Sequence, residues 1–159
     1  MGTRTDHDLS AGFINYSNQR ESNPIRGALA EVILGLISAT ELNARRVFEQ
    51  QLEALQVTEE YGIFLTELTL DANGQFALRQ MAGVLLKQYV DVHWSIDAEK
   101  FKPPEASPQT KATIRAILPH GLKESISKVR SSVAYCISCI AHWDWPDEWP
   151  ELFNILTTW

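Results

Sequence analysis

The sequence predicts an all-α protein made of stacked antiparallel helical hairpins. Apolar residues recur at intervals of three and four along most of the chain, and no run alternates as a strand would. Caps, glycines and prolines divide the periodic segments into about seven short helices, most of them joined by short turns. With 159 residues, 45% of them hydrophobic, the chain can form one domain or a few stacked repeats with a sizeable core.

The N-terminal part of the chain contains the first helix-start signals. Residues 1–22 are polar and aperiodic, so we expect them to form a disordered arm. Asn23 and Pro24 then combine a preferred N-cap with proline at the first helical position, which predicts the first helix. Thr40 and Thr58 are expected to cap the second and third helices.

The fourth helix is predicted to be the longest, from Gln75 to about His93. It follows a turn in which Gly74 is expected to adopt a left-handed conformation. After it, residues 95–107 form a long connection with two prolines that exclude a helix. The side chains expected to face the core from the fourth helix are Phe76, Ala82, Leu85, Leu86 and Tyr89.

Three further helical segments are expected after this connection. Ser107 and Pro108 repeat the cap-and-proline signal and start a helix that should bend at Pro119. Residues 126–142 form a helix rich in small side chains, and a last segment ends the chain. The apolar face of that last segment has no hairpin partner, so we expect residues 23–159 to be a repeat domain incomplete at its C-terminus. Its members are Trp149, Leu152, Phe153, Leu156 and Trp159.

The spacing of alternate helices suggests a helical repeat. The fourth predicted helix follows the second by about 35 residues, and the sixth follows the fourth by about 50, around the period of HEAT-type repeats. A single hairpin has too little core to be stable, so each hairpin must bury its apolar face against its neighbours.

Charge and composition exclude several classes of function. The net charge of −6 argues against a general nucleic-acid binder, which must neutralise phosphates. No apolar run reaches the length of a membrane span, and no signal peptide is recognisable. Two cysteines form no disulfide framework, which favours a reducing compartment.

The charge is unevenly distributed along the chain. Residues 79–130 carry nine Lys and Arg against five Asp and Glu, while the segments on either side are acidic. A basic middle between acidic ends suits a charged protein partner, whose association would weaken in salt. The alternative is ordinary solvation of the surface.

Few residues suggest chemistry. Cys136, Cys139 and His142 could lie near one face of a helix, but a structural zinc site needs four ligands and a redox pair needs a helix N-terminus. We therefore expect packed thiols, with no metal and no cofactor. The carboxylate pairs at 59–60 and 147–148 fall where first helical turns are expected, which favours capping over catalysis. The chain is therefore not expected to be an enzyme.

A tryptophan cluster precedes the last helix. Trp143, Trp145 and Trp149 could stack on nucleic-acid bases, but their segment contains no Lys or Arg to bind the phosphates. We expect the three rings to fill the corner between two repeats.

A polar stripe remains on the second helices of two hairpins. In stacked hairpins the second helices line the concave face of the stack, so both parts of the stripe should border the same hollow. The alternative is that these polar side chains are simply solvated. On the fourth helix the stripe contains Gln80, Lys87 and Asp91, with Arg79 and Gln88 beside it. On the sixth helix it contains Lys128, Ser131 or Ser132, Tyr135 and His142.

Several segments resemble the N-terminal domain of the importin-β, or karyopherin-β, family. The helix LRQMAGVLLKQYVDVHW at 78–94 and the stretch KVRSSVAYCISCIAHWDWPDEWPELF at 128–153 carry most of the similarity. TEEYGIFLTELTLD at 58–71, KFKPPE at 100–105 and LPHGLKESISKVRSSVAY at 118–135 extend it. The similarity covers about residues 25–159, with these segments in the family's order.

The resemblance implies a right-handed superhelix of HEAT repeats, of which this chain would hold about three and a half. It also implies a nuclear transport receptor that shuttles between cytoplasm and nucleus and binds Ran-GTP, protein cargo and nuclear pore proteins. Core histones are among the cargoes of the branch that it resembles most. The family binds Ran through second helices, which here would use Arg79, Gln80, Lys87, Gln88, Asp91, Lys128, Ser131, Ser132 and Tyr135.

Two other interpretations stay open at this point. One is a HEAT-like interaction scaffold that does not respond to Ran. The other is a small metal or thiol redox protein that uses Cys136, Cys139 and His142.

Overall fold

The computed structural model describes residues 23–158, and those residues form helices and connections without a strand. The disordered arm expected at 1–22 and the predicted contact of Trp159 lie outside this range. The elements in chain order are α2 (Pro24–Ser38), α3 (Leu42–Gln56), α4 (Tyr61–Leu70), α5 (Phe76–His93), α6 (Pro108–Ile117), the 3-10 helix η1 (Leu118–Lys123), α7 (Ser127–Asp144) and α8 (Leu152–Thr158).

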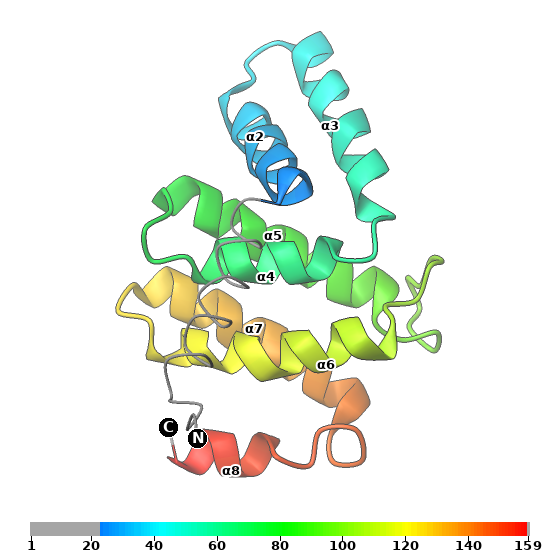
Figure 1. Ribbon diagram of the computed structural model, residues 1–159, viewed down its shortest axis with the longest axis vertical. Helices are drawn as coiled ribbons and strands as arrows, with labels where there is room; N and C mark the ends of the chain where they lie inside the picture. The colour runs from blue at the N-terminus through cyan, green and yellow to red at the C-terminus, as the bar shows by residue number, and fades with distance from the viewer. Residues whose placement is uncertain (1–22, 159) are drawn as a thin grey trace, which may run out of the picture.

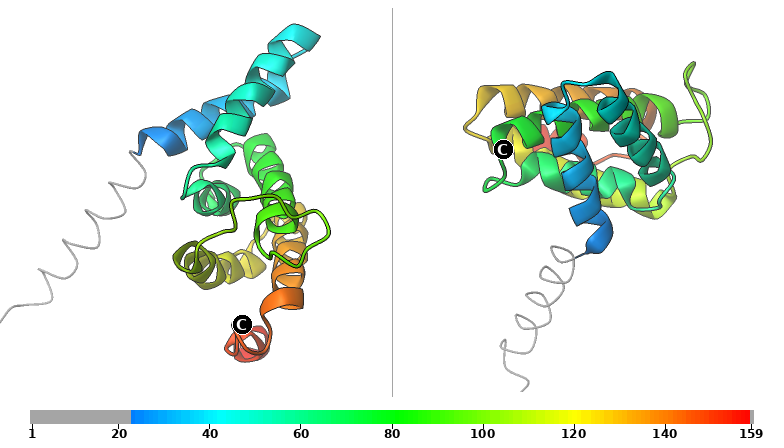
Figure 2. Two further views of the ribbon diagram at one scale, coloured as in Figure 1. Left: turned by 90° about the vertical axis from the view of Figure 1, so that its right-hand side faces the viewer. Right: turned by 90° about the horizontal axis from the view of Figure 1, so that it is seen from above.

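The helices stack as antiparallel hairpins, which confirms the predicted fold class. In Figure 1 the α4/α5 hairpin lies beside the α6/α7 hairpin, with α4 next to α6 and α5 next to α7. The side view in Figure 2 separates α4 and α6 from α5 and α7 as two layers. The α2/α3 hairpin closes one end by packing α2 on α5 and α4, and α8 lies at the other end.

Two of the predicted helix caps are present. The Asn23 side chain accepts a hydrogen bond from the Ile25 amide at 2.9 Å, and Pro24 follows it at the first helical position. The Ser107 hydroxyl accepts the Thr110 amide at 3.1 Å at the start of α6. Both side chains satisfy amides that have no partner within the helix.

The caps expected at Thr40 and Thr58 are wrong. Helix α3 begins one residue later than Thr40 would place it, with Glu41 at the N-cap and no side-chain bond there. The Thr58 hydroxyl donates instead to the Leu55 carbonyl at 2.6 Å, so it closes α3 and leaves the start of α4 without a side-chain cap.

The turn between α4 and α5 depends on an aspartate rather than on a left-handed glycine. The Asp71 carboxylate accepts the Asn73 amide at 3.0 Å, and the Asp71 carbonyl accepts the Gly74 amide at 3.0 Å. No described glycine has a positive φ, so the prediction for Gly74 is wrong. A β-carbon at Gly74 would lie 3.2 Å from the Asp71 carbonyl oxygen, so crowding explains the small residue.

Helix α5 is the centre of the core, because it packs against α2, α4 and α7. Its predicted inward positions are buried, except that Phe76 in its first turn is 41% exposed. Fully burying each large apolar side chain contributes roughly 1.5–3 kcal/mol. The largest completely buried side chains include Phe64, Leu65, Leu86, Trp94, Ile114, Leu118 and Ile140.

A buried aspartate joins the ends of α5, α6 and α7. The Asp144 carboxylate accepts the Trp94 indole N–H at 3.0 Å and pairs with the Arg115 guanidinium at 2.7 Å. Its carbonyl oxygen accepts the amides of Glu148 and Trp149. Asp144 therefore connects the ends of the α4/α5 and α6/α7 hairpins with the loop that leads into α8.

The tryptophan cluster is divided between core and surface. Trp149 is 3% exposed and fills the corner as expected, but Trp143 and Trp145 are 37% and 50% exposed. The corner interpretation is therefore wrong for these two residues. Trp94, which was not part of the predicted cluster, is completely buried and donates its indole N–H to Asp144.

The acidic pairs expected in first helical turns lie elsewhere. Asp147 and Glu148 belong to the turn before α8, and Glu59 precedes α4 and accepts the Thr110 hydroxyl at 3.2 Å. The 3-10 helix begins at Leu118, directly after α6, so Pro119 lies in its first turn and does not bend a continuing α-helix. On α8, Leu152 is buried whereas Phe153 and Leu156 are exposed, so only part of its apolar face is uncovered.

Replacing Asp144 by alanine should lower the free energy of unfolding by about 3 kcal/mol, because it leaves a nearly buried guanidinium and a buried indole N–H unpaired. Urea denaturation followed by circular dichroism measures this change. The matched control is Asp147→Ala, at an exposed position three residues away, where we expect a change within about 0.5 kcal/mol. Equal losses in the two variants would contradict the role of Asp144.

Candidate protein-interaction surface

Helices α5 and α7 are in close contact at Gly83. A β-carbon at Gly83 would lie 2.5 Å from the Ser132 hydroxyl oxygen, so a side chain there would require the Ser132 hydroxyl to move. The Cys136 sulfur lies 4.0 Å from the Gly83 carbonyl oxygen, one turn further along α7. Small side chains at this crossing therefore bring the polar residues of the two helices onto one surface.

The centre of this surface is a lysine held against a tyrosine. The Lys87 ammonium nitrogen lies 4.2 Å from the centroid of the Tyr135 ring, within the range of a cation–π contact. Tyr135 is 51% exposed, and Lys87 is exposed as well. The pair thus presents an aromatic ring and a positive charge together to solvent.

The helices run in the same direction, because Gly83 faces Ser132 and Lys87 faces Tyr135. By this register, half-buried Asp91 lies near Cys139, and its charge helps to raise the pKa of that thiol. Asp91 therefore extends the surface beyond Lys87 with a charge of the opposite sign.

The other predicted residues follow the same two helices. Gln80 and Gln88 are exposed on α5, and the register places Gln80 near the level of Lys128. Lys128 and Ser131 are exposed on α7, while Ser132 is half-buried at the helix crossing. We define the α5–α7 surface as Gln80, Lys87, Gln88, Asp91, Lys128, Ser131, Ser132 and Tyr135.

Arg79 does not belong to this surface. Its side chain is buried, its Nε donates to the Thr69 carbonyl at 3.1 Å, and its terminal nitrogen pairs with Glu124 at 2.6 Å. It therefore joins α4, α5 and the segment before α7. Sequence reasoning placed Arg79 beside the stripe because helical spacing cannot show a carboxylate 45 residues further along the chain.

The pairing with Arg79 changes the titration of Glu124. The hydrogen bond and positive charge of Arg79 hold the pKa of Glu124 below its ordinary value of 4.5. The ionised carboxylate is therefore the form that the folded chain favours.

The contribution of Glu124 to stability should depend on pH in a defined direction. Because the pKa of Glu124 is lower in the folded state, its stabilisation is present above about pH 4.5 and is lost as the pH falls through the folded-state value. Thermal unfolding of the chain and of Glu124→Gln should therefore differ at pH 7 and converge in acid. A difference that stays constant down to pH 2 to 3 would contradict this linkage.

The thiols of Cys136 and Cys139 are packing groups in this structure. Burial raises the pKa of Cys136 to about 12 and also raises the pKa of Cys139, so both favour the unreactive thiol form. Within residues 23–158, no group of three or more His, Cys, Asp or Glu side chains lies together as metal ligands.

Alkylation should distinguish these thiols from reactive ones. With iodoacetamide at pH 7.5, Cys136 should be modified only as fast as the chain unfolds, and half-buried Cys139 more slowly than free cysteine. Intact mass and peptide mapping over time give both rates, with the urea-unfolded chain as the control. Rapid modification of both thiols in the folded chain would restore the redox interpretation.

None of the described helices is long and apolar enough to cross a membrane. The charged residues of the α5–α7 surface are Lys87 and Asp91 on α5 and Lys128 on α7, so the surface carries both signs of charge. Such an arrangement fits contact with another protein, because an exposed aromatic side chain and both charge signs are present within one area.

Comparisons of this sequence with known proteins agree on one family of relatives. Residues 48–124 match the family described as the importin-β N-terminal domain. The chain is 40% identical over 135 residues to Importin-9 of Drosophila melanogaster, an overlap of 83% of this chain and 13% of that protein. It is 30% identical over 123 residues to Importin subunit beta-5 of Schizosaccharomyces pombe, which covers 76% of this chain and 12% of that protein.

A solved structure shows the same fold. The exportin Cse1 in its cargo-free, cytoplasmic state aligns with a TM-score of 0.65 at 19% sequence identity. The alignment covers 83% of this chain and 14% of Cse1. The chain thus spans about an eighth of the length of these relatives, so it corresponds to a part of each.

Proposed function

The chain belongs to the importin-β family, and we propose that it forms the part of a nuclear transport receptor that binds Ran in its GTP-bound form. The α5–α7 surface is the observation that carries this proposal. It lies on the second helices of two neighbouring hairpins, which are the helices that the family resemblance assigns to Ran.

The geometry of the Lys87–Tyr135 pair suits a protein partner. A tyrosine ring offers a rigid contact area at low entropic cost, and the cation held over it is already positioned. The opposite charges of Lys87 and Asp91 on α5 would fix the orientation of a partner that carries complementary charges. This pair is therefore the expected centre of the interface.

Recognition of the nucleotide state would come from Ran rather than from this chain. The γ-phosphate and its metal order the switch segments of a GTPase, and these segments are released after hydrolysis. A surface that binds the ordered segments therefore favours the GTP form without contacting the nucleotide. We propose a binding module that adds no catalytic group to hydrolysis.

The wider role follows from the family and rests on the same proposal. A receptor containing this chain would carry protein cargo, with core histones as candidates, interact with nuclear pore proteins and shuttle between cytoplasm and nucleus. Since the chain spans about an eighth of its relatives, most of the cargo surface would lie in repeats outside it. We propose no direct contact with nucleic acid or membrane.

Lys87→Glu should weaken binding to Ran loaded with a non-hydrolysable GTP analogue by at least tenfold, since it reverses a charge at the centre of the interface. Isothermal titration calorimetry against Ran in the GTP-analogue and GDP forms measures the effect. The GDP form should bind far more weakly or not at all.

Lys102→Glu is the matched control, because it makes the same charge change at an exposed position on the 95–107 connection. It should retain the affinity of the unmodified chain to within about twofold. Equal binding to both nucleotide forms, or equal losses in the two variants, would contradict the proposal. A folded chain that binds neither form would favour the Ran-independent scaffold.

A further inference from the structure

A second feature of the fold lies on the side of α5 that faces α3 and α4, and it shares Gln88 with the α5–α7 surface. A cavity of about 100 Å³ opens where the end of α3 and the start of α4 meet α5. This volume well exceeds the 10–15 Å³ or so that one water molecule requires. Its lining consists of Gln56, Tyr61, Leu85, Gln88, Tyr89, Val92 and His93.

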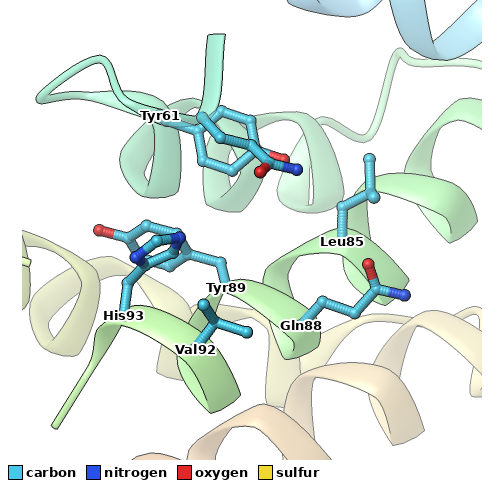
Figure 3. A pocket seen from close by; sticks show the side chains of 7 residues that line it. Tyr61, Leu85, Gln88, Tyr89, Val92 and His93 are labelled. Carbon is cyan, nitrogen blue, oxygen red and sulfur yellow. The ribbon is translucent and has the colours of Figure 1, made fainter. Parts of the chain in front are cut away.

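Aromatic rings form the wall of this cavity. Figure 3 shows Tyr61 of α4 facing Tyr89 and His93 of α5, with Leu85 and Gln88 further along the same helix. The Tyr61 and Tyr89 ring centroids are 5.7 Å apart in an edge-on arrangement, and those of Tyr89 and His93 are 5.4 Å apart. Tyrosine ring faces are electron-rich and attract cations.

The residues that line the cavity differ in their exposure to solvent, so the cavity is open on one side. Tyr61 and Tyr89 are 2% and 7% exposed, whereas Gln88 is exposed and Gln56 is half-buried. Burial raises the pKa of Tyr61 to about 12, so its hydroxyl stays protonated, and Gln56 is hydrogen-bonded to it. The mouth therefore carries amide groups, and the aromatic wall lies behind them.

The charge around the cavity is negative. A smaller adjoining cavity of about 30 Å³ shares Gln56, Tyr89 and His93 and is also lined by Glu59 and Glu105. Lys111 pairs with Glu105 at 2.8 Å, whereas no ion pair joins Glu59 to another described residue. The Glu59 charge reaches Tyr89, because it contributes to the raised pKa of that tyrosine.

Hydrogen-bond acceptors complete the site. His93 Nδ1 lies 2.9 Å from the Pro104 carbonyl oxygen, which can only accept, so Nδ1 donates. In the neutral ring Nε2 is then an acceptor. Of the described residues, no lysine or arginine lines either cavity, so no side chain of the lining already supplies a cation.

We propose that this cavity receives the guanidinium group of an arginine side chain presented by a protein partner. A guanidinium group is planar, stacks on tyrosine and donates several hydrogen bonds at once, which matches two tyrosines beside amide and imidazole acceptors. Glu59 supplies the nearby opposite charge. The inference goes beyond the proposed function, because it assigns a contact outside the α5–α7 pair of Lys87 and Tyr135.

The site can be probed without a macromolecular partner. We would titrate the 159-residue chain with N-acetyl-arginine-N′-methylamide and follow the aromatic and amide NMR signals of Tyr61, Tyr89 and His93. The citrulline derivative has nearly the same shape without the charge, and the lysine derivative has the charge without the planar group. Saturable shifts with the arginine probe, and weaker shifts with the other two, are expected.

Glu59→Gln tests the charge while keeping an oxygen that can accept the Thr110 hydroxyl. It should weaken the arginine probe about two- to fivefold, as expected for an exposed charge pair. Glu53→Gln, at an exposed position on α3 outside the lining, is the matched control and should leave affinity unchanged. Both variants keep the aromatic wall, so folding is preserved.

Three results would overturn the inference: no saturable shift with the arginine probe, equal binding of the citrulline derivative, or equal or tighter binding of the lysine derivative. Equal affinities of Glu59→Gln and Glu53→Gln would remove Glu59 from the site and would also contradict the proposed charge recognition. The Ran titration uses another ligand and another variant, so its outcome is independent of these results.

Discussion

A β-carbon at residue 83 would lie 2.5 Å from the Ser132 hydroxyl oxygen and 3.5 Å from the Ser132 β-carbon, so glycine at this position lets α5 and α7 pack with the Ser132 hydroxyl where it is. Glycine weakens a helix by about 1 kcal/mol relative to alanine, and the packing of two apolar helix faces more than offsets this loss. One turn beyond the crossing, the same approach brings Lys87 against Tyr135. The packing of the two hairpins and the geometry of the candidate surface therefore meet at this crossing.

A second glycine has the corresponding effect between α4 and α5. A β-carbon at Gly62 would collide with the Tyr89 ring, so the absence of a side chain there admits the ring. Tyr89 in turn stands beside Tyr61 and His93 in the aromatic cavity. Helix α5 thus meets both α4 and α7 at glycine contacts, and each contact positions a different group of side chains.

Two ion pairs add to this packing, one between neighbouring hairpins and one within the α6/α7 hairpin. Arg79 pairs with Glu124, and Arg115 pairs with Asp144, in both cases between residues distant in sequence. A buried pair contributes little net free energy, but the loss of one partner is costly because the other charge stays desolvated. Lys87, by contrast, keeps its charge at the surface, where a partner can reach it.

Local sequence determined the helices, because caps and apolar spacing act within a few residues. The signals at Asn23 and Ser107 predict where two helices start, and the apolar spacing predicts the long helix α5 and the helix α7. The resemblance of several ordered segments also identified the family. The residues of the α5–α7 surface could be selected from a polar stripe, since helical periodicity assigns side chains to faces of a helix, whereas Arg79 was selected with them and is buried.

Only the tertiary structure decided which of these side chains are exposed. Arg79 and Lys87 are both cations on α5, but Glu124 and the Thr69 carbonyl bury the first, while the second remains open to solvent. Likewise, the partner of Trp94 is Asp144, 50 residues further along the chain. The aromatic cavity combines α3, α4 and α5, so no single helical pattern contains it. Periodicity assigns a residue to a face of its own helix, whereas burial and pairing depend on what the fold places against that face.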